Sequence, residues 1–179
     1  MSQPQTVHSR SRLDALTATD CGALAQLAEV IWRAHYTKII SSAQVDYMLA
    51  GRYTPERLRT YLNAADRWFM LLRIDNRIIG YCSYALAENP GEMKIREMKL
   101  EQLYLLPEYC GQGLGRLMMR HVEQQARACG CGTLMLQVNK HNDIAIAFYR
   151  KSGFIVREEA VFDIGNGFVM DDYVMEKAL

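Results

Sequence analysis

The chain has 179 residues, half of them hydrophobic, with 21 basic and 20 acidic side chains. This length and composition predict one globular domain with a sizeable core. The net charge is only +1, and the charged residues are scattered along the chain. Charge therefore argues against a protein that binds nucleic acid or an anionic membrane surface.

The beginning of the chain, MSQPQTVHSRSRLDAL, lacks the apolar core of a secretory signal peptide. No segment approaches the roughly 18 apolar residues that a membrane span needs, so we expect a soluble, cytoplasmic protein. The five cysteines are odd in number and form no CxxC pairs, which favours reduced thiols. Half a zinc site at Cys129 and Cys131 is the alternative, but no second pair of ligands stands nearby, and we expect no metal.

The first part of the chain predicts helices. Residues 1–12 are polar and are expected to form a disordered tail, followed by a single domain over residues 13–179. Thr19 and Asp20 are suited to cap a helix whose apolar residues recur at helical spacing. Two shorter helices are expected at residues 42–50 and 54–64.

The rest of the chain alternates strands and helices. WFMLLRI and IIGYCSYAL predict a β-hairpin around the turn DNR, and KIREMKLEQLYLL predicts a third strand after a loop marked by Gly91. A helix follows from Gly113 to near Gly130, then the buried strand TLMLQV and a helix from Asn142 to Gly153. FIVREEAVF and FVMDDYVMEKAL are expected strands around the turn DIGNG. The expected order is α, α, α, β, β, β, α, β, α, β, β.

A glycine-rich loop, LPEYCGQGLGRLMM, joins the third strand to the helix after it. Gly111, Gly113 and Gly115 stand at alternate positions and remove the Cβ atoms that would hold a phosphate away from the backbone. The N-terminus of the helix adds N–H groups and the positive end of its dipole, and Arg116 adds a charge. The loop predicts a phosphate or pyrophosphate site, with a tight turn that binds no ligand as the alternative.

Two common nucleotide-binding signatures do not fit this loop. The P-loop pattern needs Lys-Ser or Lys-Thr after its last glycine, and neither pair is present. A Rossmann loop needs G-x-G-x-x-G after the first strand of a βαβ repeat, whereas this loop follows a meander of three strands. Neither the P-loop nor the Rossmann signature therefore accounts for this loop.

A second motif, NKHNDIAIAFYRKSGF, lies on the helix that begins at Asn142. Asn142, Ala145 and Tyr149 share one helical face at spacings of three and four. We interpret Phe148 as a core residue. The Tyr149 hydroxyl needs a hydrogen-bond partner if it is buried, and a position near the glycine loop would supply one.

LEQLYLLPEYCGQGLGRLMM followed by NDIAIAFYRKSGF resembles the acetyl-CoA-binding core of the GNAT superfamily of N-acetyltransferases, over Glu101 to Phe154. The resemblance implies an α/β fold of the α+β, mixed-sheet kind, the GNAT acyl-CoA N-acyltransferase fold. Such a fold has a central, mostly antiparallel, twisted sheet with a splayed parallel strand pair, flanked by helices. It also implies acetyl-CoA as the cosubstrate and N-acetylation as the activity.

The resemblance implies a set of cofactor-binding residues. Backbone amides of the loop would bind the CoA pyrophosphate, namely Gly111, Gln112, Gly113, Leu114, Gly115 and Arg116. Backbone groups of Leu103 and Leu105 would pair with the pantetheine arm as an extra strand does. Asn142 and Tyr149 would lie near the pantetheine and the CoA sulfur. Cys110 also belongs to the set, but it stands where the family has Arg or Gln, so a side-chain contact is in question there.

Acetyl transfer from a thioester to an amine needs a neutral amine, a polarised carbonyl and a proton for the leaving thiolate. Glu101 is the candidate base, directly or through water, and Glu97 on the same strand face is the second candidate; both being solvated glutamates is the alternative. A backbone N–H near Leu103 would hold the thioester oxygen. The resemblance makes Tyr149 the acid. A covalent route through Cys110 lacks an adjacent histidine, so direct transfer is expected.

The acceptor is suggested by looser similarity. FDIGNGFVMDDYVMEKAL and HYTKIISSAQVDYML are similar to bacterial spermidine/spermine acetyltransferases, which makes a polyamine the leading acceptor. Carboxylates suited to line a polyamine pocket are Asp163, Asp171, Asp172, Glu97 and Glu101. An amino acid, an antibiotic, a protein N-terminus and a non-catalytic CoA-binding regulatory module remain alternatives. A homodimer through SAQVDYMLAGRY or the last strands is also left open.

Overall fold

The computed structural model describes residues 10–87 and 96–179. The expected loop at Gly91 and the first two residues of KIREMKLEQLYLL lie outside these ranges. The chain divides into two compact units: unit 1 comprises Met1–Ser83 and Gln102–Met119, and unit 2 comprises Tyr84–Glu101 and Arg120–Leu179. The expectation of one domain over residues 13–179 remains a prediction.

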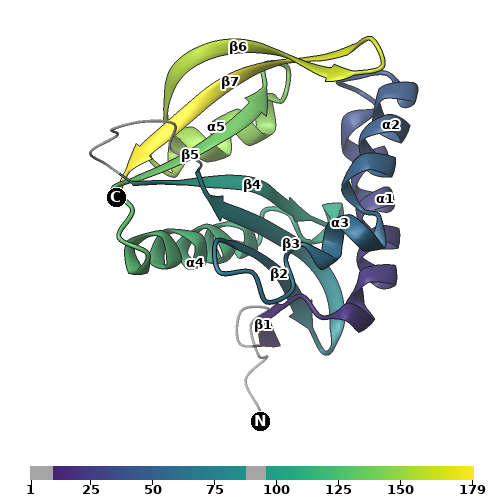
Figure 1. Ribbon diagram of the computed structural model, residues 1–179, viewed down its shortest axis with the longest axis vertical. Helices are drawn as coiled ribbons and strands as arrows, with labels where there is room; N and C mark the ends of the chain where they lie inside the picture. Colours follow the sequence, from purple (N-terminus) through teal and green to yellow (C-terminus); the bar gives the residue numbers. More distant parts are fainter. Residues whose placement is uncertain (1–9, 88–95) are drawn as a thin grey trace. The chain divides into compact units, whose positions relative to one another are not determined.

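The described residues form seven strands and five α-helices. The strands are β1 (Ser11–Ala15), β2 (Arg67–Ile74), β3 (Arg77–Leu86), β4 (Glu97–Leu105), β5 (Thr133–Asn139), β6 (Ile155–Gly165) and β7 (Phe168–Ala178). The α-helices are α1 (Cys21–Tyr36), α2 (Ser42–Arg52), α3 (Pro55–Arg59), α4 (Leu114–Ala128) and α5 (Asp143–Lys151). Short 3-10 turns are η2 (Ala18–Asp20) and η3 (Pro107–Tyr109). Figure 1 shows these elements in chain order by colour.

Strand β1 was not expected from the sequence. It pairs antiparallel with β2, from Ser11↔Ile74 to Ala15↔Met70. It therefore begins inside the segment 1–12 that was expected to be disordered. The alternation of Ser, Arg, Leu, Asp and Ala is too short to predict a strand, and the pairing partner lies more than 50 residues away.

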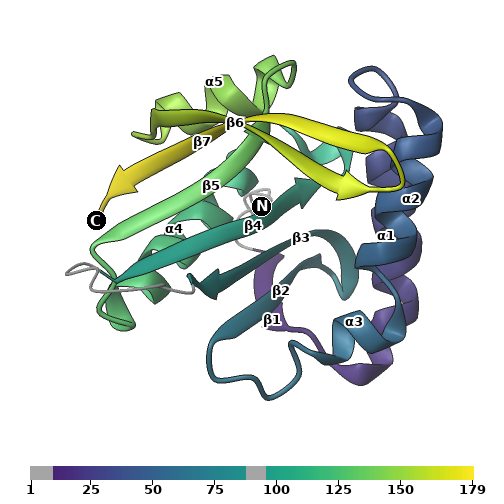
Figure 2. The same ribbon diagram turned by 45° about the horizontal axis from the view of Figure 1, so that its top comes forward.

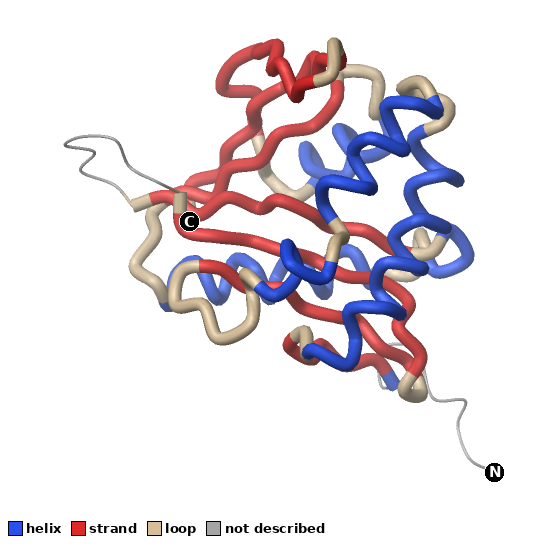
Figure 3. The backbone as a smooth tube through the Cα atoms, turned by 45° about the vertical axis from the view of Figure 1, so that its right-hand side comes forward, coloured by secondary structure: helices blue, strands red, loops and turns tan. Residues whose placement is uncertain are grey.

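Local capping explains where the helices of unit 1 begin. The Ser41 hydroxyl accepts a hydrogen bond from the Gln44 N–H, and the Thr54 hydroxyl accepts one from the Arg57 N–H, both at 3.2 Å. Pro55 fills the first position of α3, as predicted. Helix α3 ends at Arg59, however, well before the expected residue 64. In Figures 1 and 3, α1 and α2 lie side by side, joined by an ion pair between Arg33 and Asp46.

The predicted hairpin of β2 and β3 is confirmed. Its turn residues Asp75 and Asn76 both have positive φ, 47° and 69°, which is the conformation of a two-residue turn that matches the twist of the strands. Gly80 in β3 lies against the end of β4, where an added Cβ would come within 2.6 Å of both the Leu105 side chain and the Tyr104 carbonyl oxygen. Glycine at this position therefore lets the two strands approach closely.

The seven strands have the order β1-β2-β3-β4-β5-β7-β6 in a mixed sheet. In unit 2, β4 and β5 are parallel, whereas β5 pairs antiparallel with β7 and β7 with β6 (Figure 2). The apolar run of β5 is buried, as predicted for a strand covered on both faces. The mixed sheet with a parallel pair and flanking helices is the expected fold.

Each unit has its own core. Unit 1 buries residues from α1 to β3, including Leu24, Trp32, Leu58, Leu72 and Tyr81. Unit 2 buries residues around β5, including Met98, Val122, Leu134, Phe154 and Met175. Within the described ranges, no helix is long and apolar enough to cross a membrane.

Candidate active site

The glycine loop has the backbone that its sequence predicts. Gly111 and Gly113 have φ of 76° and 81°, which side chains other than glycine rarely adopt. Gly115 lies in the first turn of α4 and needs no such conformation. The loop is exposed, and α4 begins after Gly113, which has no side chain to cap the helix. By helix geometry, the first N–H groups of α4 lack intrahelical acceptors and suit an anion.

Cys110 opens the loop without being activated. Its thiol donates a weak hydrogen bond to the Leu106 carbonyl oxygen at 3.7 Å. Burial, and then the nearby Glu108 carboxylate, raise the pKa of the Cys110 thiol above its ordinary value. A thiol of this kind stays protonated at neutral pH and is a poor nucleophile. The protonated Cys110 thiol therefore argues against a covalent acetyl-cysteine intermediate.

Strand β4 carries the residues expected to meet the thioester. Its ladder with β5 covers four residue pairs, from Glu97↔Thr133 to Leu100↔Leu136, although β4 continues to Leu105. Side chains alternate along the strand, so Glu101, Leu103 and Leu105 share one face and Gln102 and Tyr104 the other. Leu103 and Leu105 are half-buried and belong, with residues 110–116, to unit 1.

The two candidate bases have different surroundings in unit 2. The Glu97 carboxylate is only 13% exposed and forms an ion pair with Arg157 at 3.1 Å. Arg157 also pairs with Glu176 on β7 at 3.3 Å. Glu101 is half-buried and lies one residue beyond the last β4–β5 pair. Glu97 is therefore held in an ion-pair network, and Glu101 remains the predicted base.

The second motif belongs to unit 2 and follows β5. Asn142 is the N-cap of α5: its side-chain oxygen accepts the Ala145 N–H at 3.3 Å, as predicted. Asn142 is buried, and its side-chain oxygen is engaged in this cap. Tyr149 is half-buried, with its ring edge-on to Phe148 and Phe154 at centroid distances of 5.4 and 5.7 Å. Phe148 is likewise half-buried rather than fully in the core.

Three of the five carboxylates expected to bind a polyamine are engaged elsewhere in unit 2. Asp171 pairs with Lys140 at 2.5 Å. Asp163 accepts the Gly165 N–H at 2.8 Å in the β6–β7 turn. Glu97 pairs with Arg157. These contacts engage Asp171, Asp163 and Glu97 and stabilise the strands that carry them.

A group of aromatic side chains in unit 1 was not recognised from the sequence. We call it the aromatic cluster, and it consists of Trp32, Tyr36, Tyr53, Tyr81 and Tyr104. The Tyr53 hydroxyl donates to the Gln102 side-chain oxygen at 2.8 Å and bonds the Tyr81 hydroxyl at 2.7 Å. The Tyr36 and Tyr104 hydroxyls lie 2.8 Å apart. The alternation of side chains along β4 places Gln102 and Tyr104 on one face, and this signal in the sequence could have indicated part of the cluster.

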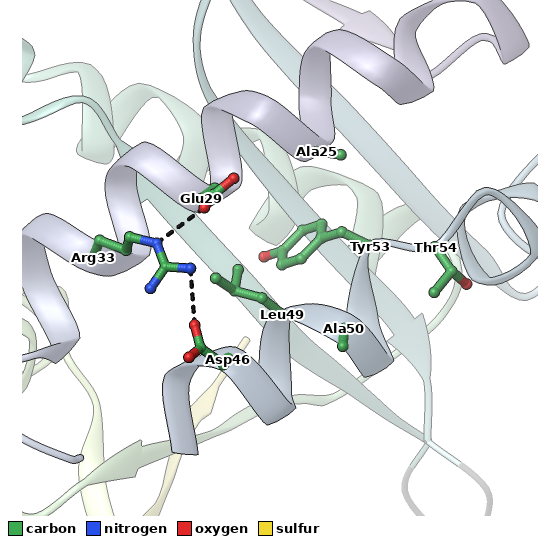
Figure 4. A pocket seen from close by; sticks show the side chains of 8 residues that line it. All are labelled: Ala25, Glu29, Arg33, Asp46, Leu49, Ala50, Tyr53 and Thr54. Atoms are coloured by element: carbon green, nitrogen blue, oxygen red, sulfur yellow. Dashed lines mark hydrogen bonds and ion pairs between the residues drawn. The ribbon is translucent and has the colours of Figure 1, made fainter. Parts of the chain in front are cut away.

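A pocket of about 270 Å³ lies between α1 and α2 in unit 1 (Figure 4). Tyr53 lines it, together with Glu29 and Asp46. Arg33 pairs with both carboxylates, at 3.0 Å to Glu29 and 2.8 Å to Asp46. The pocket contains none of the residues predicted for the site, and its carboxylates are already paired.

The geometry matches a known family. The model of the Acetyltransferase (GNAT) family matches residues 25–154, which include the glycine loop and the second motif. The chain belongs to the GNAT family. Among its relatives, an uncharacterized N-acetyltransferase of Mycobacterium tuberculosis is 29% identical over 161 residues, which are 90% of this chain and 99% of the relative. A spermidine N(1)-acetyltransferase of Thermoplasma acidophilum is 25% identical over 160 residues, 87% of this chain and 92% of the relative.

Solved GNAT structures have the same fold. PaiA N-acetyltransferase from Thermoplasma acidophilum, crystallised with coenzyme A, aligns with a TM-score of 0.77 and 25% identity, over 94% of this chain and 99% of that one. A GCN5-related N-acetyltransferase from Rhodopseudomonas palustris aligns with a TM-score of 0.76 and 17% identity, over 100% and 99%. This GNAT protein is thus an N-acetyltransferase that acts with acetyl-CoA. In the part of the chain that the structure describes, no His, Cys, Asp or Glu cluster is placed to hold a metal.

Proposed function

We propose that this GNAT enzyme transfers the acetyl group of acetyl-CoA directly to the primary amine of a small molecule. The observation that carries the proposal is the short β4–β5 ladder, which ends at Leu100 although β4 continues to Leu105. The exposed glycine loop follows β4, and α4 begins directly after Gly113. Backbone groups of β4 beyond the ladder suit the amide-rich pantetheine arm, and the loop suits its pyrophosphate. No side chain on the loop blocks such an anion, since residues 111, 113 and 115 are glycines.

The proposed roles come from the family resemblance. Acetyl-CoA supplies the acetyl group as a thioester. The N–H near Leu103 polarises the acyl oxygen, and residues 111–116 hold the pyrophosphate through their backbone amides. Glu101 accepts the proton of the ammonium, directly or through water. The resemblance assigns Asn142 to the pantetheine and Tyr149 to the protonation of the leaving thiolate.

A polyamine is the acceptor that the comparisons favour, because one relative is named a spermidine N(1)-acetyltransferase. The engagement of Asp163, Asp171 and Glu97 with other groups weakens the expected carboxylate lining. Spermidine is therefore the first acceptor to test, beside monoamines, amino acids, aminoglycoside-type antibiotics and short peptides. A homodimer and a cytoplasmic location remain predictions.

The test measures CoA release with a thiol reagent for wild type, Glu101→Gln, Glu97→Gln and Tyr149→Phe. We expect Glu101→Gln and Tyr149→Phe each to lower kcat about 100-fold. Glu97→Gln should keep kcat and instead lower the free energy of unfolding, because it breaks the pair with Arg157. Binding of acetyl-CoA without transfer to any amine would contradict catalysis and favour a regulatory CoA-binding module. A loss of kcat on Glu97→Gln alone would move the base to Glu97.

A further inference from the structure

The residue after Leu103 is Tyr104, a member of the aromatic cluster, and the residue before it is Gln102, which is hydrogen-bonded to the cluster. Gln102 is buried and accepts the Tyr53 hydroxyl, and Tyr104 is half-buried and bonds the Tyr36 hydroxyl. If the Leu103 N–H holds the acyl oxygen, these two side chains are the nearest along β4 to the carbon that an amine must reach. All of these residues lie in unit 1.

The rings of the cluster are in mutual contact. Trp32 lies 4.7 Å from Tyr36, 6.1 Å from Tyr53 and 5.7 Å from Tyr104, measured between ring centroids. Tyr81 lies 5.9 Å from Tyr53 and 5.4 Å from Tyr104. Such rings present negative faces that attract an alkylammonium group, and their bodies suit an apolar chain. Tyr104 is half-buried, whereas the other four members are buried, so Tyr104 is the ring of the cluster that a ligand can reach from solvent.

The cluster carries no negative charge of its own. Burial raises the pKa of Tyr53 and of Tyr81 well above the usual value for tyrosine, so both hydroxyls stay neutral. A cation already contacts the cluster: the Arg52 guanidinium lies 5.7 Å from the Trp32 ring centroid. Glu29 and Asp46 share a pocket with Tyr53, but Arg33 pairs with both. An acceptor here meets aromatic faces and hydroxyls, and the Arg52 cation opposes positive charge, so an acceptor with one ammonium group is favoured over one with two.

The indole of Trp32 adds a spare donor to this environment. Trp32 is 1% exposed, and its Nε1 atom makes no hydrogen bond of good geometry with the described residues. It is close enough to the Tyr53 and Tyr81 hydroxyls to lower their pKa slightly, against the larger effect of burial. A buried N–H without a hydrogen-bond partner destabilises the fold, and a ligand that accepts a hydrogen bond from it would remove that cost.

We propose that the aromatic cluster receives the acceptor, with Tyr104 as a specificity-determining residue, and that the acceptor is a primary amine with one positive charge on an apolar body. The proposal rests on the proposed acetyl transfer but not on a polyamine substrate. A second ammonium group gives the acceptor no advantage.

The first experiment compares acceptors. Initial rates are measured with spermidine, an unbranched monoamine of similar chain length and phenethylamine, at low and high NaCl. We expect kcat/KM for the two monoamines to equal or exceed that for spermidine, and to change by no more than about twofold with salt, because no exposed ion pair forms. A carboxylate-lined pocket would instead give a strong preference for spermidine that falls steeply with salt, and this would overturn the proposal.

The second experiment changes Tyr104. Tyr104→Leu removes the ring and should raise the KM for both monoamines about tenfold, leaving the KM for acetyl-CoA within about twofold. Tyr104→Phe keeps the ring and should keep the preference for monoamines. The matched control is Tyr47→Leu, a 37% exposed tyrosine of α2, which should change neither KM. Thermal melting of each variant shows that it is folded.

The outcomes separate this inference from the proposed function. Acetyl transfer to amines with an unchanged KM in Tyr104→Leu would overturn the aromatic acceptor site while leaving the acetyltransferase intact. No transfer to any amine by the wild type would contradict the proposed function itself. If Tyr104→Leu does not fold, the comparison of acceptors with the wild type decides the matter, because a strong, salt-sensitive preference for spermidine would overturn the aromatic acceptor site.

Discussion

Gly111 and Gly115 of the glycine loop differ in the physical property that requires glycine. Gly111 has a positive φ, and a Cβ there would meet nothing within 4 Å, so its requirement is conformational. Gly115 has no positive φ and lies inside α4, where glycine is a poor helix former. The approach of a ligand to the backbone is the reason that we propose for glycine at position 115.

This difference predicts opposite effects of alanine at the two positions. Gly115→Ala should raise the Kd for acetyl-CoA about tenfold while leaving the free energy of unfolding unchanged or higher by up to about 1 kcal/mol. Gly111→Ala should lower the free energy of unfolding by about 1–2 kcal/mol, because alanine disfavours the left-handed conformation. Isothermal titration calorimetry and urea unfolding measure the two quantities. Equal Kd values for Gly115→Ala and wild type would contradict a ligand at this position.

At the scale of the element, β4 links the two kinds of candidate residue. One face carries Glu97, Glu101 and Leu103, and the other carries Gln102 and Tyr104 of the acceptor side that we propose. The end of the strand is held close to β3 by a backbone hydrogen bond from the Leu106 N–H to the Ile79 carbonyl oxygen at 2.9 Å. The position of Leu103 therefore depends on how closely β3 approaches.

Gly80→Ala tests this dependence. The new Cβ would lie 2.6 Å from the Tyr104 carbonyl oxygen, so β4 must shift, and we expect a loss of about 1–3 kcal/mol in unfolding free energy and a lower kcat/KM. Gly51→Ala in α2 is the matched control, since nothing lies within 4 Å of its Cβ and alanine favours a helix. Kinetics and urea unfolding of both variants give the comparison. Wild-type kcat/KM in Gly80→Ala would show that the spacing of β3 and β4 does not matter for the reaction.

For the stability of the whole molecule, the half-buried His121 matters at mildly acidic pH. The His121 Nε2 atom lies 3.0 Å from the Tyr84 hydroxyl in unit 2, and burial lowers the pKa of His121 below its usual 6.5. Between that folded pKa and 6.5, the unfolded chain binds more protons than the folded one. Stability is therefore complete above pH 6.5 and is lost as the pH falls through the folded pKa.

The variant His121→Gln should flatten this dependence, because glutamine can still bond the Tyr84 hydroxyl but does not titrate. We expect the free energy of unfolding of the wild type to fall more between pH 7.5 and 5 than that of His121→Gln. Each unit of pKa depression corresponds to about 1.4 kcal/mol. Urea unfolding followed by circular dichroism at the two pH values measures the difference. Equal slopes would show that His121 is not the group responsible.

Much of the fold followed from local pattern. Glycines, caps and hydrophobic periodicity report interactions between near neighbours, so the loop, the hairpin and the Asn142 cap were predicted, and the two motifs identified the family. Strand β1 and the short α3 were missed, because pairing and packing with distant segments decided them.

What the sequence by itself determined was the acetyl-CoA-binding motif and the fold that contains it. Only the tertiary structure decided which polar groups are already engaged. Glu97 and Arg157 are 60 positions apart, and Tyr36 and Tyr104 are 68 apart, yet each pair shares a hydrogen bond. Such contacts depend on the path of the chain through the fold, and no local spacing encodes them. They turned Glu97 into an ion-pair partner and brought scattered tyrosines together beside Leu103.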